Sequence, residues 1–193
     1  MSKQVWKPGN MVYPLPVVMI SLADKAGKAN IITVAWTGTV CTNPAMVYIS
    51  VKPERYSYDI LKETKEFVIN LTTEATAYAT DYCGVKSGRQ VDKFKELKLT
   101  KEKAEHVASP MIGECPVNIE CKVMEIKKLG SHHMFLAKVL AVHVDEEYMN
   151  SRGKFQLEEA KPIVYSHGDY FSLGRKVGEF GYSVKKRKTK KKR

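Results

Sequence analysis

The sequence contains no long apolar run and no recognisable export signal. Among its 193 residues, no apolar stretch approaches the ~20 residues that a helix needs to cross a bilayer. The first residues, MSKQVWKPGNMVYPLP, lack an apolar segment followed by a small-residue cleavage site. We therefore expect a cytoplasmic protein that does not enter a membrane.

Cysteine and histidine patterns that bind metals are also missing. No two of the four cysteines form a Cys-x-x-Cys pair, so neither a zinc knuckle nor a redox motif is present. The five histidines are scattered, apart from His132 and His133. Neighbouring residues on a strand point to opposite faces, so these two are poorly placed to share a metal ion. We expect reduced thiols and no metal site. The cysteines are Cys41, Cys83, Cys115 and Cys121.

Three common catalytic motifs are absent. No G-x-G-x-x-G follows a strand, which argues against a Rossmann dinucleotide site. There is no G-x-x-x-x-G-K-[ST] phosphate loop and no G-x-S-x-G elbow of a serine hydrolase. Any catalytic or binding function must therefore depend on residues outside these three motifs.

Most of the positive charge lies at one end of the chain. The formal net charge is +11, but the run from Lys185 to Arg193 contains eight basic residues and no acidic one. The rest of the chain has an excess of only three positive charges. Like charges in such a run repel one another, so we expect residues 184–193 to form a disordered, solubilising tail. Binding of RNA or DNA through counterion release is the alternative role for this tail.

Apolar and alternating runs predict an antiparallel strand-rich domain. The first two runs flank the turn-forming DKAGK and predict a hairpin. The segment from Val117 to Val123 alternates strictly, as expected for a sheet with one wet face. The predicted strands are Val17–Leu22, Asn30–Trp36, Ala45–Lys52, Glu66–Leu71, Val117–Ile126 and His133–Glu147.

Helices are fewer and short. We predict one from Ser57 to Thr64 with Ser57 as its N-cap, one from about Glu74 to Tyr82 closed by Gly84, and one over residues 91–97. The spacing of strands and hairpins indicates a mostly β (α+β) fold, a β-barrel with helices at its ends. Residues 1–183 read as a single domain.

The segment SVKPERYSYD, residues 50–59, suggests an anion site. A strand ends near Lys52, and a helix begins near Ser57. Free N–H groups and the positive end of the helix dipole attract anions, and Arg55 offers a forked contact to a phosphate. A solvated loop before an N-capped helix explains the same residues, and the loop alone does not decide between the two interpretations.

Two further segments complete a candidate pocket. The loop GVKSGRQVDKF, residues 84–94, adds Gly88 and three cations, although a lysine-rich loop is by itself a weak signal. The stretch NIITVAWTGTVCTNP, residues 30–44, has more hydrogen-bonding groups than a plain core strand needs. Beside a phosphate loop, its Asn and Thr groups and Trp36 would suit a ligand with a phosphate, a polyol and an aromatic ring. Core packing of Trp36 is the alternative.

These three segments, together with GSHHMFLAKV, resemble the flavin reductase-like, FMN-binding split-barrel family. The similarity covers about residues 11–170, and within the family the chain looks most like the flavoredoxins. The resemblance implies a six-stranded antiparallel Greek-key split barrel. It also implies a homodimer with FMN near the subunit interface.

The resemblance assigns roles by position. Residues expected to border the flavin ring and ribityl chain are Asn30, Thr33, Ala35 and Trp36. Those expected to hold the phosphate and adjacent chain are Ser50, Val51, Arg55 and Ser57. Those expected to approach the flavin from the second loop are Ser87, Gly88, Arg89 and Lys93, with Lys93 or Arg89 as the cation near N1 and O2. His132 is the catalytic candidate, near the flavin face or the nicotinamide path, and Tyr170 reaches the site from the C-terminal segment.

The implied function is that of an FMN-binding oxidoreductase or electron-transfer flavoprotein. Many free-flavin reductases carry small residues where this chain has Ile31–Trp36, and the Trp resembles flavoredoxins, in which FMN stays bound. The alternatives are an NAD(P)H:flavin oxidoreductase that releases reduced flavin and, in a different class, a nucleic-acid-binding barrel that uses the basic tail. NAD(P)H or a protein is the expected electron donor.

Overall fold

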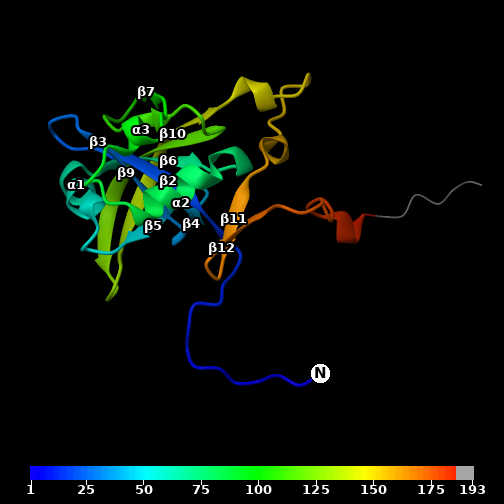
Figure 1. The fold of residues 1–193 in the computed structure, drawn as a ribbon. Helices are drawn as coiled ribbons and strands as arrows, with labels where there is room; N and C mark the ends of the chain where they lie inside the picture. Colours follow the sequence, from blue (N-terminus) through cyan, green and yellow to red (C-terminus); the bar gives the residue numbers. More distant parts are fainter. Residues whose placement is uncertain (186–193) are drawn as a thin grey trace, which may run out of the picture.

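The computed structural model describes residues 1–185, so the predicted tail lies outside the described residues from residue 186 onward. Strands dominate, and hairpins and short helices join them (Figure 1). The strands are β1 (Leu15–Pro16), β2 (Val18–Ala23), β3 (Ala29–Val34), β4 (Thr37–Cys41), β5 (Met46–Val51), β6 (Glu66–Leu71), β7 (Lys101–Glu102), β8 (Met111–Ile112), β9 (Val117–Lys128), β10 (His133–Val144), β11 (Ile163–Ser166) and β12 (Asp169–Ser172). The helices are α1 (Tyr56–Thr64), α2 (Ala77–Val85) and α3 (Lys93–Glu96), and the 3₁₀ turns are η1 (Glu74–Thr76), η2 (Glu146–Tyr148), η3 (Leu157–Ala160) and η4 (Tyr182–Val184). Within residues 1–185, no helix is long and apolar enough to span a bilayer.

The main sheet is curled so that its two edges meet. Its strand order is β3-β2-β6-β9-β10-β5-β4, and all neighbours are antiparallel. The edge strands β3 and β4 are joined by only Ala35 and Trp36, which span about 10 Å at most. The sheet must therefore curl until β3 and β4 approach each other at this link, where the Trp36 carbonyl extends the pairing of β4 with β5 by accepting the Ser50 N–H at 2.8 Å. The predicted mostly-β antiparallel barrel is confirmed, although the sheet has seven strands because β4 forms an additional short edge.

Strand β2 is buried on both faces because it separates two apolar layers. Val18 and Ile20 point into the barrel, where they join Phe67 and Phe135. Met19 points the other way, toward residues of α2 and α3 such as Phe94. The two helices therefore cover the outer face of β2 and β3, which places the C-terminal end of α2 beside β3.

Two local predictions need correction. Ser57 is not an N-cap: α1 begins at Tyr56 with Arg55 as N-cap, and the Ser57 hydroxyl instead accepts a hydrogen bond from the Asn30 amide at 2.9 Å. Gly84 does not close α2, which continues to Val85. Gly84 instead packs on Thr33, whose Cβ would lie 3.4 Å from an added Cβ. Each difference comes from a contact between segments far apart in sequence.

A second, small sheet carries the C-terminal hairpin. Its order is β1-β11-β12, and it places Tyr165 directly opposite Tyr170. Backbone hydrogen bonds from Ile163 to Thr72 and from Glu74 to Lys161 attach this hairpin to the segment before α2. The hairpin thereby forms a wall beside α2.

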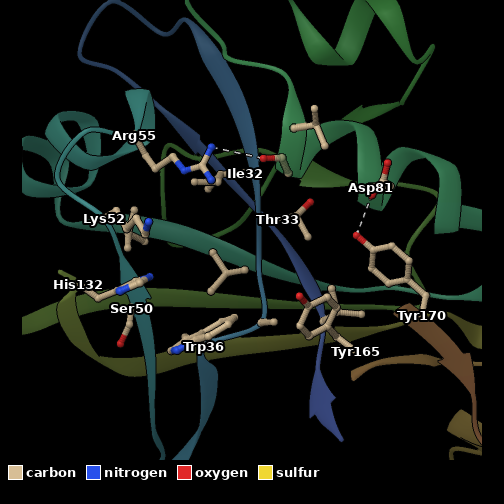
Figure 2. A pocket seen from close by; sticks show the side chains of 16 residues that line it. Ile32, Thr33, Trp36, Ser50, Lys52, Arg55, Asp81, His132, Tyr165 and Tyr170 are labelled. Carbon is tan, nitrogen blue, oxygen red and sulfur yellow. Dashed lines mark hydrogen bonds between the residues drawn. The ribbon is translucent and has the colours of Figure 1, made fainter. Parts of the chain in front are cut away.

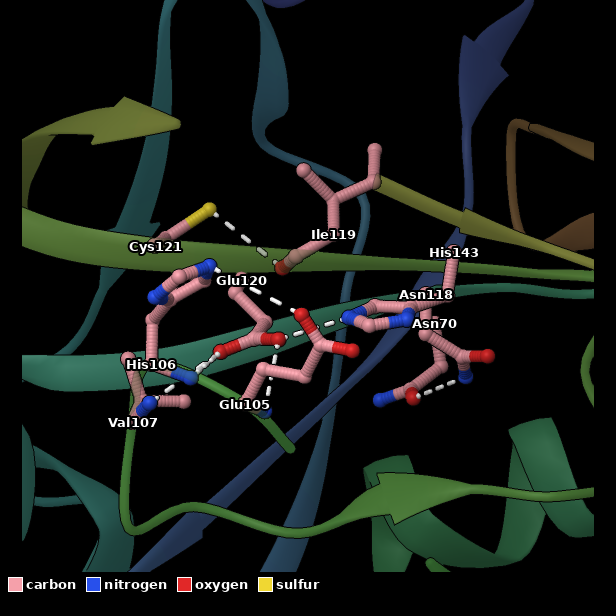
Figure 3. A network of polar contacts seen from close by, with 9 residues as sticks. All are labelled: Asn70, Glu105, His106, Val107, Asn118, Ile119, Glu120, Cys121 and His143. Carbon is pink, nitrogen blue, oxygen red and sulfur yellow. Dashed lines mark hydrogen bonds and ion pairs between the residues drawn. The ribbon is translucent and has the colours of Figure 1, made fainter. Parts of the chain in front are cut away.

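Glu120 of β9 is fully buried and anchors a loop to the sheet (Figure 3). Its carboxylate accepts the N–H groups of Glu105, His106 and Val107 and contacts His143 Nε2 at 2.6 Å. Burial alone would raise the pKa of Glu120, but these hydrogen bonds together hold it below the ordinary value. The ionised carboxylate is therefore a structural group.

Replacing Glu120 with glutamine should lower the free energy of unfolding at pH 7 by about 2–4 kcal/mol, because an amide cannot accept all these hydrogen bonds. The wild type should lose this stabilisation as the pH falls below the unfolded value of 4.5 through the lower folded pKa. Urea denaturation at several pH values would measure both effects. Glu125→Gln, on an exposed part of the same strand, is the matched control, and equal stability of the two variants would contradict the assignment.

Candidate functional site

A cavity of about 470 Å³ opens where the sheet edges meet beside α2. We call it the Trp36 pocket. Four aromatic rings line it (Figure 2). Strands β3 and β5 complete the wall with apolar side chains such as Ile32. The rings are those of Trp36, His132, Tyr165 and Tyr170. Its volume lies within the ~300–1,000 Å³ range of small-molecule sites, so an aromatic ligand can be enclosed here.

Trp36 and His132 form a stacked pair at the pocket. Their ring centroids are 5.8 Å apart with an interplanar angle of 7°. Trp36 occupies the link between β3 and β4, and His132 lies directly before β10. Burial, followed by the charge of Lys52, lowers the pKa of His132 from its ordinary value. These effects favour the neutral imidazole, which can accept a proton.

The opposite wall comes from the C-terminal hairpin. Tyr165 packs 6.5 Å from Trp36 and 5.9 Å from Tyr170, centroid to centroid. The Tyr170 hydroxyl donates to Asp81 of α2 at 3.1 Å, and burial followed by this contact raises the pKa of Tyr170 to about 12. Sequence reasoning missed Tyr165. The sequence contained a signal for Tyr165, because the turn between IVYS and DYFS predicts a hairpin, and such a hairpin pairs Tyr165 with Tyr170.

A second cavity of about 280 Å³ adjoins the first. We call it the Arg89 pocket. Ile32, Arg55 and Gly84 line both pockets, so the two are direct neighbours. Its other walls come from the first turn of α1 and from the loop after α2, and they are mainly polar. The polar side chains include Asn30, Ser57, Lys86, Ser87, Arg89 and Lys93. The N–H groups of the first turn of a helix lack intrahelical partners and favour an anion.

Lys93 supplies a buried positive charge to the Arg89 pocket. The residue is 3% exposed, and its ammonium donates to the carbonyls of Ile31 at 2.6 Å and Cys83 at 2.7 Å. No carboxylate of residues 1–185 lies within 4.0 Å of it. Burial is the main reason that the pKa of Lys93 falls to about 8. A buried ammonium is costly without a counter-ion, so an anionic ligand is the fitting partner.

Gly88 allows the loop to pack against α1 and β3. A Cβ at this position would lie 2.6 Å from Tyr56 Cδ1 and would overlap the Asn30 side chain. Asn30 is the residue that donates to Ser57. The close approach therefore requires glycine, and it fixes the polar wall of the Arg89 pocket.

All fourteen residues selected from the sequence line one of the two pockets. Their distribution differs from the expectation in three respects. Ser50 and Val51 lie in the Trp36 pocket, whereas Asn30 lies in the Arg89 pocket with Ser57. Lys93 and Arg89 line the Arg89 pocket only, so neither is placed as a cation beside the ring of a ligand in the Trp36 pocket. No cluster of three or more His, Cys, Asp or Glu side chains suited to a metal ion occurs within residues 1–185.

Residues 10–174 match the family model of the flavin reductase-like domain. The chain belongs to this family. It is similar in structure to flavoredoxin of Desulfovibrio vulgaris (Miyazaki F), with a TM-score of 0.88 and 27% identity over 95% of this chain and 100% of that one. Flavoredoxin from Methanosarcina acetivorans gives a TM-score of 0.84 at 27% identity over the same shares of the two chains.

A third similar structure is an FMN-binding protein from Thermus thermophilus with bound 1-cyclohex-2-enone. It has a TM-score of 0.77 and covers 93% of this chain and 99% of its own, but at 18% identity it shows the fold alone. The flavin reductase-like split-barrel fold predicted from sequence is thus confirmed. The roles of individual residues stay predictions.

Proposed function

We propose that the protein binds FMN across the two pockets, with the phosphate in the Arg89 pocket and the ring system in the Trp36 pocket. The observation that carries this proposal is the buried Lys93 ammonium, which has two carbonyl partners and no carboxylate among the described residues. A phosphate would supply the missing counter-charge. Arg55 lines both pockets and is placed to interact with the part of the ligand between them.

The Trp36 pocket fits a flat, partly polar ring system. Trp36 and His132 present parallel rings, and Ile32 and Val51 add apolar contact. Bound FMN would supply hydride and single-electron chemistry. The chain would orient the ring, exclude water, and hold a proton on neutral His132 within reach of the site.

We propose that this flavoprotein acts as an oxidoreductase or electron carrier of the flavoredoxin type, with FMN held as a prosthetic group. The similarity to two flavoredoxins supports this choice. The second candidate is an NAD(P)H:flavin oxidoreductase that releases reduced flavin. Stopped-flow reduction by NADH, NADPH and a reduced ferredoxin would separate the two. Fast oxidation of a nicotinamide together with release of reduced flavin would favour the second candidate.

Titration of flavin-free protein with FMN and with riboflavin tests the binding proposal. FMN should bind roughly 100-fold more tightly, because riboflavin lacks the phosphate that would pair with Lys93 and its neighbours. Tryptophan fluorescence or calorimetry would give both dissociation constants. A protein that is purified colourless and fails to bind added FMN would rule out the proposal.

FMN affinity should fall as the pH rises above 8. The phosphate monoester is already a dianion above its second pKa of about 6, whereas Lys93 loses its proton around its pKa of about 8. The anion favours charged Lys93, so the dissociation constant should be about tenfold higher at pH 9 than at pH 7. Burial raises the pKa of Cys83 to about 11, so this thiol stays neutral over that range. A dissociation constant that stays flat from pH 7 to 9 would contradict the phosphate assignment.

We also propose a homodimer and a cytoplasmic location. Alternate residues of β10 expose an apolar row, Leu140, Val142 and Val144, at 38%, 55% and 40%, and such a row suits burial against a second copy. Light scattering on the eluted protein would test the dimer.

The four cysteines are unpaired, as suits a reducing compartment. The alternative of nucleic-acid binding depends on the basic tail, and deletion of residues 184–193 would test it.

A further inference from the structure

One face of α2 exposes aromatic and aliphatic side chains beside the Trp36 pocket. Tyr78, Tyr82 and Val85 lie at positions i, i+4 and i+7, which places them on one side of the helix. Tyr78 is 75% exposed and Val85 is 69% exposed, and the two tyrosine rings stack at 6.2 Å. Val85 also lines the Trp36 pocket. The apolar face therefore reaches the pocket itself.

Cations outnumber acidic residues in the lining of the two pockets. Five cationic and two acidic residues line the two pockets, an excess of three positive charges. Residues 1–184 as a whole have the same excess, because the tail contains eight of the 32 basic residues and none of the 21 acidic ones. The residues of the body outside the pocket lining therefore carry no net charge, and the lining accounts for the net positive charge of the body. The lining residues are Lys52, Arg55, Lys86, Arg89 and Lys93, with Glu54 and Asp81.

The cationic region extends beyond the space that a flavin would fill. Lys28 and Arg89 both lie over the Tyr56 ring, at 5.9 and 5.5 Å from its centroid. Lys28 is exposed and lines neither pocket. A bound phosphate would neutralise buried Lys93 and its nearest neighbours, but it would leave Lys28, which lines neither pocket, available to a larger ligand.

We propose that Tyr78, Tyr82 and Val85, rimmed by Lys28, Lys86 and Arg89, dock an acidic electron-transfer protein at the mouth of the Trp36 pocket. This inference rests on the proposed function. A small apolar centre with a charged rim suits a transient encounter, because charge steers the partner and the apolar contact brings the two redox centres close. Each encounter would oxidise the donor by one electron. Two donor molecules are then consumed for each two-electron reduction of the flavin, and the protons come from water.

A second copy of the chain fits this surface less well. A two-fold dimer would place the patch against itself, and the two cationic rims would repel one another. A dimer formed through the apolar row on β10 would not require the two cationic rims to face one another. The charge of the α2 surface therefore selects a partner of opposite sign.

Stopped-flow reduction of the FMN-loaded protein tests the inference, with a small acidic ferredoxin as probe donor. The second-order rate constant should fall about tenfold or more between 20 and 300 mM salt. Tyr78→Ser and Lys28→Glu should each lower it severalfold at low salt, while FMN absorbance and reduction by dithionite stay unchanged. Lys103→Glu, in the exposed loop after β7 and outside both pockets, makes the same charge change and should have little effect.

Binding of the same ferredoxin, measured by biolayer interferometry, gives a readout that is independent of turnover. It should weaken with salt and in both surface variants. A protein that binds FMN but is reduced without salt dependence, or equally well in all variants, would overturn the docking inference alone. Dissociation of a homodimer by Tyr78→Ser would also overturn the docking inference, because the surface would then bind a second copy. RNA binding that survives deletion of the tail would overturn it as well, because the surface would then bind nucleic acid. Failure to bind FMN would instead overturn the proposed function.

Discussion

Replacing Lys93 with methionine is expected to raise the dissociation constant for FMN roughly 10- to 100-fold, while leaving the affinity for riboflavin nearly unchanged. Methionine keeps the length and apolar character of the side chain but removes the buried charge. A charged hydrogen bond to phosphate contributes about 1.5–3 kcal/mol, which corresponds to this range. Titrations with the two flavins would measure the difference.

The Lys93 variant has a matched control on the same helix. Lys95 of α3 is exposed and lines neither pocket, so Lys95→Met should bind FMN as the wild type does. Lys93→Met should also abolish the weakening of FMN affinity between pH 7 and 9, because the group that titrates has been removed. An equal loss for FMN and riboflavin would show that Lys93 acts only on structure, through the carbonyls of Ile31 and Cys83.

Replacing Gly88 with valine is expected to weaken FMN binding by up to about 100-fold. The new side chain would collide with Tyr56 and Asn30, and displacement of Asn30 would break its hydrogen bond to Ser57. Overpacking of this kind costs about 1–3 kcal/mol. Because the collision lies in the Arg89 pocket, the phosphate end of the ligand should be affected most. Calorimetric titration with FMN and a thermal melt would separate lost binding from lost folding.

A second glycine provides the comparison for Gly88. An added Cβ at Gly174 meets no atom within 4 Å, and its backbone is not in the left-handed region. Gly174→Val should therefore bind FMN normally. Wild-type affinity in Gly88→Val would mean that the loop moves without cost, and that the close approach to Asn30 does not shape the site.

The sequence indicated which residues line the pockets, but it did not indicate which residues these side chains contact. The resemblance to the flavin reductase-like family assigned roles to fourteen positions, and all of them line the two pockets. Local patterns assigned Ser57 to a helix cap, because a serine before a helix commonly caps it. Its actual partner, Asn30, is 27 residues away, and no local rule indicates such a pair.

Lys93 illustrates the same limit in electrostatics. The resemblance made Lys93, or alternatively Arg89, the candidate cation near N1 and O2 of the flavin ring. The fold instead buries the ammonium between β3 and α2, against the Ile31 and Cys83 carbonyls. Burial depends on which helix covers β3, and that is decided by packing across the whole sheet. The pKa of Lys93 near 8 follows from this packing.

The sequence by itself determined the strand-rich class, the hairpin of β2 and β3, and the polar, cationic character of the loop before α1, because these depend on local periodicity and on residue types. The tertiary structure alone decided how the segments meet. The two-residue link at Trp36 forces the sheet to curl, and the curl brings β3, β5 and the C-terminal hairpin around one cavity. Contacts between distant segments depend on chain closure and packing, which no short stretch of sequence specifies.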